Sequence, residues 1–243
     1  MWKWDYKVGF ENMFIDYHLS TINAPEYTST QVYQHRERTL ERTSGLVTKD
    51  LSFSLHDPDN FEKTLLDRRT WVTSFPQGRI LDEQLIAHFA QIAFIGGEGE
   101  RRTYPSGGAQ YYVNIHFLFN ENIVSPDLVH EGNICEVDAD HNQLVFKDHI
   151  PWSTIQKSFI QEYLGATAQC AIVLSVPLSS ISKKYTDISY KLVQQEAGHI
   201  GQNIQLVSTH LELKSVPLGG FYDMELSHLI GGRETVLYTF LIG

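Results

Sequence analysis

Residues 101–119 read RRTYPSGGAQYYVNIHFLF, which places a Pro-Ser-Gly-Gly turn directly before a run of β-branched and aromatic residues. The run at 111–119 has no helical period, and this predicts a central strand buried on both faces of a sheet. Adjacent glycines let backbone N–H groups approach an anion or a flat ring, and Ser106 adds a hydroxyl. Taken alone, a turn of this composition is more often only a turn.

The elements around this segment alternate without a regular βα period. Asp82 and Gly96 are the expected caps of one helix. A longer helix is expected over residues 190–213, where Gly198 and Gly201 each cost about 1 kcal/mol relative to Ala, so we expect a ligand or a partner helix to approach that face. The irregular alternation indicates an α+β layered fold with a mixed sheet. The remaining expected elements are a helix over 152–163, a strand over 170–178, a short helix over 223–230 and a strand over 235–242.

Composition and charge narrow the classes of function. The formal net charge of −10 repels a phosphate backbone, so we expect no nucleic-acid partner. No stretch approaches the roughly 20 apolar residues that span a bilayer, and no signal-peptide run is visible, so we expect a soluble cytoplasmic protein. Cys135, Cys170 and the histidines show no metal-ligand spacing. The sequence therefore predicts no catalytic metal.

Five motifs follow one another over residues 101–243. Together they closely resemble the SagB-type dehydrogenases, nitroreductase-like enzymes that oxidise azoline rings in modified peptides to azoles. In chain order the motifs are the Pro-Ser-Gly-Gly turn, Lys184-Tyr185, Tyr190-Lys191, the helical Glu196-Ala197-Gly198-His199 with Gln202-Asn203, and Gly219-Gly220.

The sequence also departs from the family pattern. Gln110 replaces the usual Leu, Tyr112 the usual Pro and Lys191 the usual Arg. Upstream, residues 68–70 (Arg-Arg-Thr) are similar to the arginine-rich start of the nitroreductase fold, which holds the FMN phosphate, although Val72 stands where a further Arg is usual. The resemblance does not reach residues 1–60. We interpret those as an N-terminal extension before an FMN-dependent domain over residues 61–243.

The resemblance implies a three-layer α+β sandwich with a mixed, mostly antiparallel sheet. It also implies an intertwined homodimer with one FMN at each of two sites built from both subunits. The expected partners are a cyclodehydratase complex and its modified precursor peptide, and oxygen is expected to reoxidise the flavin. By the same resemblance, the catalytic residues are Lys184 and Tyr185, and the residues that bind FMN are Arg68, Arg69, Thr70, Ser106, Gly107, Gly108, Gln202, Asn203, Gly219 and Gly220.

The Lys184-Tyr185 pair suits this chemistry. Converting an azoline to an azole removes a hydride equivalent and a proton, so the site needs an electron acceptor and a base. A neighbouring ammonium favours the tyrosine phenolate, and a desolvated lysine can itself lose its proton. Without the resemblance, we would interpret Lys184 as a solvated lysine in a loop. Lys183 is adjacent, and only the spacing to Tyr190 and Glu196 selects Lys184.

Two other functions remain open from the sequence. A small-molecule nitroreductase that draws electrons from NAD(P)H would use the same fold without a substrate base. A non-catalytic scaffold subunit of a peptide-maturation complex would keep the fold and lack the flavin. His199 is expected to be a core histidine that does not take part in catalysis.

Overall fold

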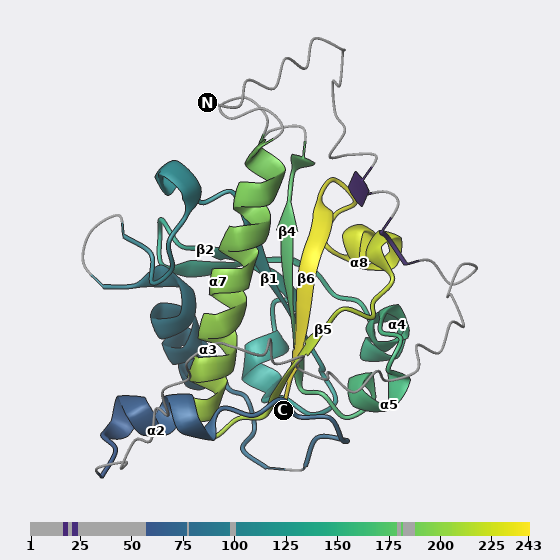
Figure 1. The fold of residues 1–243 in the computed structure, drawn as a ribbon. Helices are drawn as coiled ribbons and strands as arrows, with labels where there is room; N and C mark the ends of the chain where they lie inside the picture. Colours follow the sequence, from purple (N-terminus) through teal and green to yellow (C-terminus); the bar gives the residue numbers. More distant parts are fainter. Residues whose placement is uncertain are drawn as a thin grey trace, which may run out of the picture.

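A six-stranded sheet lies at the centre of the chain (Figure 1). The computed structural model describes residues 17–18, 21–23, 57–76, 78–97, 101–178, 181 and 188–243. The strand order is β3-β2-β1-β4-β6-β5, and every pairing among these residues is antiparallel. The strands are β1 (Asn114–Phe119), β2 (Ile134–Asp138), β3 (Gln143–Asp148), β4 (Cys170–Val176), β5 (Ser215–Leu218) and β6 (Thr235–Ile242).

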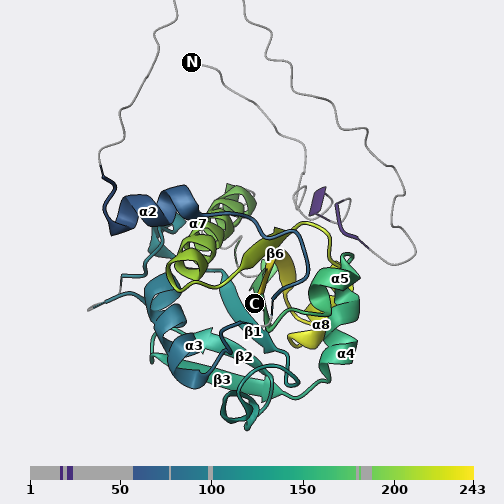
Figure 2. The ribbon, with the colours of Figure 1, turned by 90° about the horizontal axis from the view of Figure 1, so that it is seen from below.

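Helices cover both faces of the sheet (Figures 1 and 2). The long helix α7 and helix α3 lie on one face, and α4, α5 and α8 lie on the other. This arrangement confirms the expected layered α+β fold. The helical segments are α2 (Asn60–Asp67), α3 (Glu83–Ala90), the π-helix η2 (Gln91–Ile95), α4 (Trp152–Ile155), α5 (Glu162–Gly165), α7 (Ile188–His210), α8 (Asp223–Leu229) and three 3₁₀ turns, η3 (Gly107–Ala109), η4 (Pro126–Val129) and η5 (Gln156–Ser158).

The two central strands are buried on both faces, as their sequences predict. Every residue of β4 is buried. In β1, Phe117 packs in the core beneath α7, whereas Leu118 packs in the core beneath α8. The first strand begins at Asn114, three residues later than expected, because Tyr111 takes a left-handed conformation (φ +49°) that a strand cannot accommodate.

The helix expected between Asp82 and Gly96 is also confirmed. The Asp82 side chain accepts a hydrogen bond from the Leu85 N–H, which caps α3. The last turn widens into η2 and ends at Gly96, whose φ of +94° favours glycine. A Cβ there would lie 2.6 Å from the Arg101 carbonyl oxygen, so the returning chain also excludes a side chain.

The two glycines of α7, Gly198 and Gly201, occur in the helix for different reasons. A Cβ at Gly201 would lie 2.6 Å from Cζ of Phe240 and 3.2 Å from Cε1 of Tyr238, so this glycine lets the helix pack closely on β6. The expected close approach is therefore made by aromatic side chains of the sheet. Around Gly198 nothing lies within 4 Å of the added Cβ. That part of the helix faces an open space.

The single helix expected over residues 152–163 was a wrong prediction. The segment forms α4, η5 and α5, with Phe159 extended between them (φ −106°, ψ 127°). Phe159 makes an antiparallel bridge with Phe221, and the Trp152 indole N–H donates to the Gly165 carbonyl. Because Phe159 pairs with a distant segment, its backbone cannot continue the helix.

Most of the expected N-terminal extension lies outside the described residues, so the boundary near residue 60 stays a prediction. Asp59 caps α2, and its carboxylate accepts a hydrogen bond from the Glu62 N–H. No helix in the part of the chain that the structure describes is both long enough and apolar enough to cross a membrane.

The glycines of α7 provide a matched pair for a stability test. Gly201→Ala should lower the free energy of unfolding by about 1–2 kcal/mol, because overpacking against Phe240 outweighs the gain in helix propensity. Gly198→Ala should instead raise it by up to about 1 kcal/mol, since the helix gains propensity and the added methyl meets nothing. Urea unfolding of both variants measures the difference, and equal effects would contradict the packing role assigned to Gly201.

Candidate functional site

A buried carboxylate joins the Pro-Ser-Gly-Gly turn to α7. Glu196 is 2% exposed, and its Oε2 accepts a hydrogen bond of 2.5 Å from the Ser106 hydroxyl, while Oε1 accepts from the Val113 N–H at 3.2 Å. The Ser106 oxygen in turn accepts from the Tyr111 N–H at 2.9 Å. Burial raises the pKa of the Glu196 carboxyl, and these hydrogen bonds oppose the rise. Two motifs 90 residues apart in sequence are therefore held as one unit.

The two glycines of this turn, Gly107 and Gly108, have different surroundings. A Cβ at Gly107 would lie 3.1 Å from both methyl groups of Leu192, so the turn sits directly on α7. Gly108 is exposed and has a φ of +67°. Of the three turn residues expected to bind FMN, Ser106 and Gly107 have described contacts with α7, and Gly108 faces outward.

Gln202 and Asn203 of α7 also differ in their surroundings. The Asn203 amide donates to the Ala93 carbonyl at 3.0 Å and approaches Thr103, which ties the helix to the loop before the turn. Gln202 and His199 are exposed. The expectation that His199 is a core histidine was therefore wrong.

A cavity of about 560 Å³, the Gly219 cavity, lies between the N-terminal half of α7, the end of β5 and β6. Gly198 lines it from the helix and Gly219 from the strand, and a Cβ at either glycine would have no atom within 4 Å. Tyr238 contributes an aromatic wall. The neighbouring Gly220 is packed instead, since a Cβ there would lie 2.9 Å from Nε2 of Gln161. The cavity therefore has an apolar, glycine-lined wall that a planar ring can approach.

Residues near the N-terminus close one side of this cavity. The His18 Nδ1 lies 3.0 Å from the Tyr190 hydroxyl. The Asn23 N–H donates to Oδ2 of Asp223 at 2.7 Å, and its side-chain amide donates to the Gly219 carbonyl at 3.4 Å. His18, Asn23 and Asp223 could not be predicted from the sequence, because each enters the site only through tertiary contacts.

Burial changes the acid-base character of three groups in the Gly219 cavity. It lowers the pKa of the His18 imidazole, which favours the neutral ring. It raises the pKa of the Tyr190 hydroxyl and of the Asp223 carboxyl, and for Asp223 the hydrogen bond from Asn23 opposes that rise. The cavity thus contains groups that can hold or accept a proton at defined atoms.

A second cavity, of about 450 Å³, lies at the opposite end of β5 and is called the Arg69 cavity. It is lined by the cations Arg69 and Lys214, by the carboxylates of Asp67 and Glu212, and by Trp71, whose ring centre lies 5.4 Å from Nζ of Lys214. The Arg69 guanidinium also donates to the Leu66 carbonyl at 2.6 Å. Two cations and two carboxylates therefore meet at this end of the strand, and of these only Arg69 and Lys214 are suited to contact a phosphate.

The other residues of the arginine motif lie close by. Arg68 donates to the Gln205 side chain of α7 at 3.0 Å, and Thr70 is exposed. The following residue, Trp71, donates its N–H to the Ser215 carbonyl at 2.9 Å, which aligns the motif with the edge of β5.

The two cavities offer the kinds of groups that the two ends of a flavin mononucleotide would require. Such a molecule needs an apolar slot for its planar ring and cationic donors for its phosphate. Lys214 and Gly219 are five positions apart, with the four residues of β5 between them, which corresponds to about 17 Å at the usual rise. The open backbone at Gly219 and the cations at Arg69 and Lys214 thus lie at opposite ends of β5.

The expected catalytic pair, Lys184 and Tyr185, lies outside the described residues. The description resumes at Ile188, where α7 begins, and Tyr190 lines the Gly219 cavity two residues later.

Similar structures share this fold at low sequence identity. A chain of the Escherichia coli microcin synthetase McbBCD complex, solved with truncated pro-MccB17 bound, superposes with a TM-score of 0.73 and 19% identity, over 96% of this chain and 91% of that one. A nitroreductase structure from Ralstonia eutropha JMP134 gives a TM-score of 0.60 and 16% identity, over 80% and 86% of the two chains. A nitroreductase from Desulfovibrio desulfuricans, solved in complex with FMN, gives a TM-score of 0.51 and 14% identity, over 76% and 86%.

The sequence comparisons agree with the structural ones. A protein of Methanocaldococcus jannaschii named as a nitroreductase, MJ1384, is 25% identical over 142 residues, which are 58% of this chain and 70% of the relative. The model of the nitroreductase family matches residues 68–243, from the arginine motif to the end of the last strand. This match and the layered fold around the central sheet show that the chain belongs to the nitroreductase family, whose members are flavin-type oxidoreductases.

Proposed function

We propose that this protein is an FMN-dependent oxidase that converts azoline rings in a ribosomally made peptide to azoles. The observation that carries the proposal is the junction of the Pro-Ser-Gly-Gly turn with the Glu196 helix beside a glycine-lined cavity. The similarity of nearly the whole chain to a chain of a microcin synthetase with bound precursor supports a peptide substrate.

The two cavities on β5 would hold the cofactor. The Gly219 cavity, with Gly198 on its other wall, suits the planar ring, and Arg69 and Lys214 suit the phosphate. When bound, FMN supplies the hydride acceptor for the oxidation. The expected roles of Arg68, Thr70, Gln202 and the turn residues in holding it remain part of this proposal.

The chain itself would supply the proton chemistry. Lys184 and Tyr185 act as the coupled base that removes the ring proton. Tyr190 and His18 lie on the cavity wall, where their hydrogen bond fixes the hydroxyl at a defined position for orienting the peptide. Asn23 and Asp223 hold the N-terminal segment against the same wall and help to exclude water.

We further propose a homodimer that works with a cyclodehydratase in the cytoplasm and receives the modified precursor from it. Phe61, Leu65 and Leu66 of α2 are exposed together on a helix that has no buried residue. An apolar surface of this kind is typical of a contact with another subunit.

Loss of a cation at the Arg69 cavity should weaken FMN binding. The full-length protein should show flavin absorbance near about 450 nm after FMN is added. Lys214→Gln and Arg69→Gln should each raise the Kd for FMN at least about tenfold, because a charge-assisted hydrogen bond contributes about 1.5–3 kcal/mol. Lys157→Gln removes an exposed lysine outside both cavities and should leave the Kd unchanged. A wild-type protein that binds no FMN would favour the scaffold function.

The base is tested with an azoline-containing peptide. The wild type should remove two hydrogens per ring, seen by mass spectrometry, and Lys184→Ala and Tyr185→Phe should each lower the rate by roughly 100-fold or more. Lys183→Ala is the matched control and should retain the wild-type rate. Full activity in both base variants would refute the mechanism. Turnover of NAD(P)H with a nitroarene but not of the peptide would instead support the small-molecule nitroreductase.

A further inference from the structure

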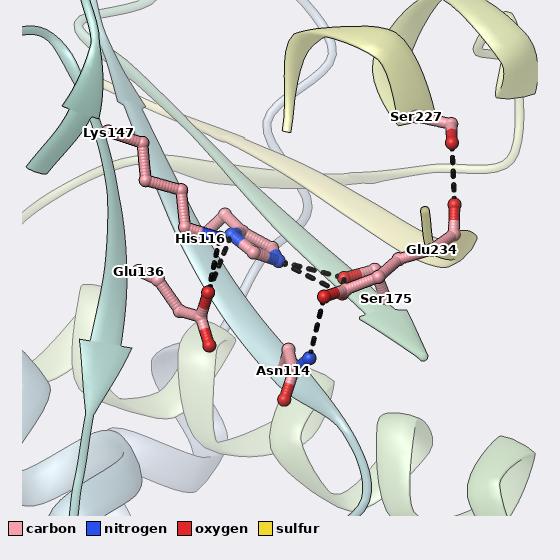
Figure 3. Close-up of polar contacts among 7 residues, drawn as sticks. All are labelled: Asn114, His116, Glu136, Lys147, Ser175, Ser227 and Glu234. Atoms are coloured by element: carbon pink, nitrogen blue, oxygen red, sulfur yellow. Dashed lines mark hydrogen bonds and ion pairs between the residues drawn. The ribbon is translucent and has the colours of Figure 1, made fainter. Parts of the chain in front are cut away.

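Three acid-base side chains converge on the face of the sheet opposite α7 (Figure 3). His116 comes from β1, Glu136 from the neighbouring strand β2 and Glu234 from the residue before β6. One possible ligand atom from each residue lies within 4.8 Å of those of the other two. These residues are called the His116 cluster, and neither the flavin site nor the proposed peptide chemistry uses them.

The imidazole is the central member of the His116 cluster and is fully buried. Figure 3 shows the ring between Glu136 on one side and Ser175 and Glu234 on the other. Its Nε2 lies 2.8 Å from Oγ of Ser175 and 3.4 Å from Oε2 of Glu234. Its Nδ1 has no hydrogen-bond partner within the described part of the chain and points toward Oε2 of Glu136 at 4.0 Å.

A buried ring nitrogen without a partner is costly, so this gap calls for an explanation. The 4.0 Å separation of Nδ1 and Oε2 is too long for a hydrogen bond. Two ligands that are each about 2.1 Å from one ion are about 3.4 Å apart in tetrahedral geometry and about 4.2 Å apart when opposite. An ion between Nδ1 and Glu136 therefore needs side-chain shifts of only about 1 Å and no movement of the strands.

The environment of the ring matches that of a metal-binding histidine. Such a histidine generally donates its second ring N–H to a carboxylate or a similar acceptor, which fixes its orientation. Here Nε2 faces Ser175 and Glu234. Glu234 is itself held by hydrogen bonds from the Asn114 amide at 2.9 Å and the Ser175 hydroxyl at 2.5 Å.

Lys147 pairs with Glu136 and would compete with an ion for that carboxylate. Lys147 on β3 pairs with Oε2 of Glu136, and its side chain is 32% exposed. Its flexible, partly exposed chain can move into solvent when Glu136 binds a divalent cation. The cluster places two carboxylates beside the single lysine Lys147, and this excess of acidic side chains favours such an exchange.

The geometry points to a divalent transition-metal site of the zinc type at Nδ1 of His116 and the Glu136 carboxylate, with Glu234 as the acceptor that orients the ring from the Nε2 side. An imidazole nitrogen and a carboxylate are ligands that zinc accepts, and water would complete the coordination. A bound ion joins β1 and β2 at two residues that are paired across these strands. It would therefore stabilise this part of the sheet.

The test is a titration of the chelator-treated, full-length protein with Zn²⁺, followed by calorimetry. The wild type should bind one ion per chain. Glu136→Gln and Glu234→Gln should each weaken binding at least about tenfold, because the first removes a charged ligand and the second removes the acceptor that orients the imidazole. Lys147→Met should strengthen binding by a roughly similar factor, because it removes the competing cation. Co²⁺ in place of Zn²⁺ should give visible absorption bands that depend on His116.

A matched control separates this site from adventitious binding. Glu131 faces Nδ1 of His130 at 3.2 Å, with both side chains more than 70% exposed, so Glu131→Gln removes the same kind of pair from the surface. It should leave Zn²⁺ binding unchanged. No Zn²⁺ uptake by either the wild type or Lys147→Met would overturn the proposal, as would binding that persists when both cluster glutamates are replaced. The lysine variant keeps His116 and both glutamates and so gives an answer even if the glutamine variants fail to fold.

Discussion

The carboxylate of Glu196 is the constraint on which the arrangement of the site depends. A buried charge is tolerated only when its oxygens are hydrogen-bonded, and both oxygens of Glu196 find donors only if the Pro-Ser-Gly-Gly turn lies against α7. That requirement fixes the entry of β1 into the sheet and the height of α7 above it. The glycine-lined half of the helix, which lines the Gly219 cavity, follows from the same placement.

Much of the fold was predictable because its main elements are locally consistent. The strand β6 and helices α3 and α7 appear where apolar spacing and capping residues predict them, since each buries a face that its own sequence defines. The prediction failed where distant contacts override local preference. Phe159 pairs with Phe221 and interrupts a helix, and Tyr111 bends the chain before β1. Neither effect has a signal in the neighbouring residues.

The site was predictable in part, for the same physical reason. Motifs that stay together in sequence, such as the turn around Ser106 and the pair at Gly219, lie in or beside the region of the candidate site. Side chains brought in by folding, including His18 and Lys214, could not be found because nothing in their local sequence marks them. The His116 cluster shows the limit most clearly. Its members come from three segments that are far apart in sequence, so a search for paired-ligand spacing along the chain could not detect it.

The position of β5 at the edge of the sheet has a consequence for how the protein can associate. The Ser215 carbonyl points away from β6 and accepts a hydrogen bond from the Trp71 N–H. Two residues later Pro217 has no N–H that could donate on this outer side of the strand. This edge therefore has little capacity to add a strand from another molecule, which protects the chain from aggregation by sheet extension. Any partner that meets this edge would have to be recognised through side chains, so specificity there would depend on surface shape and charge.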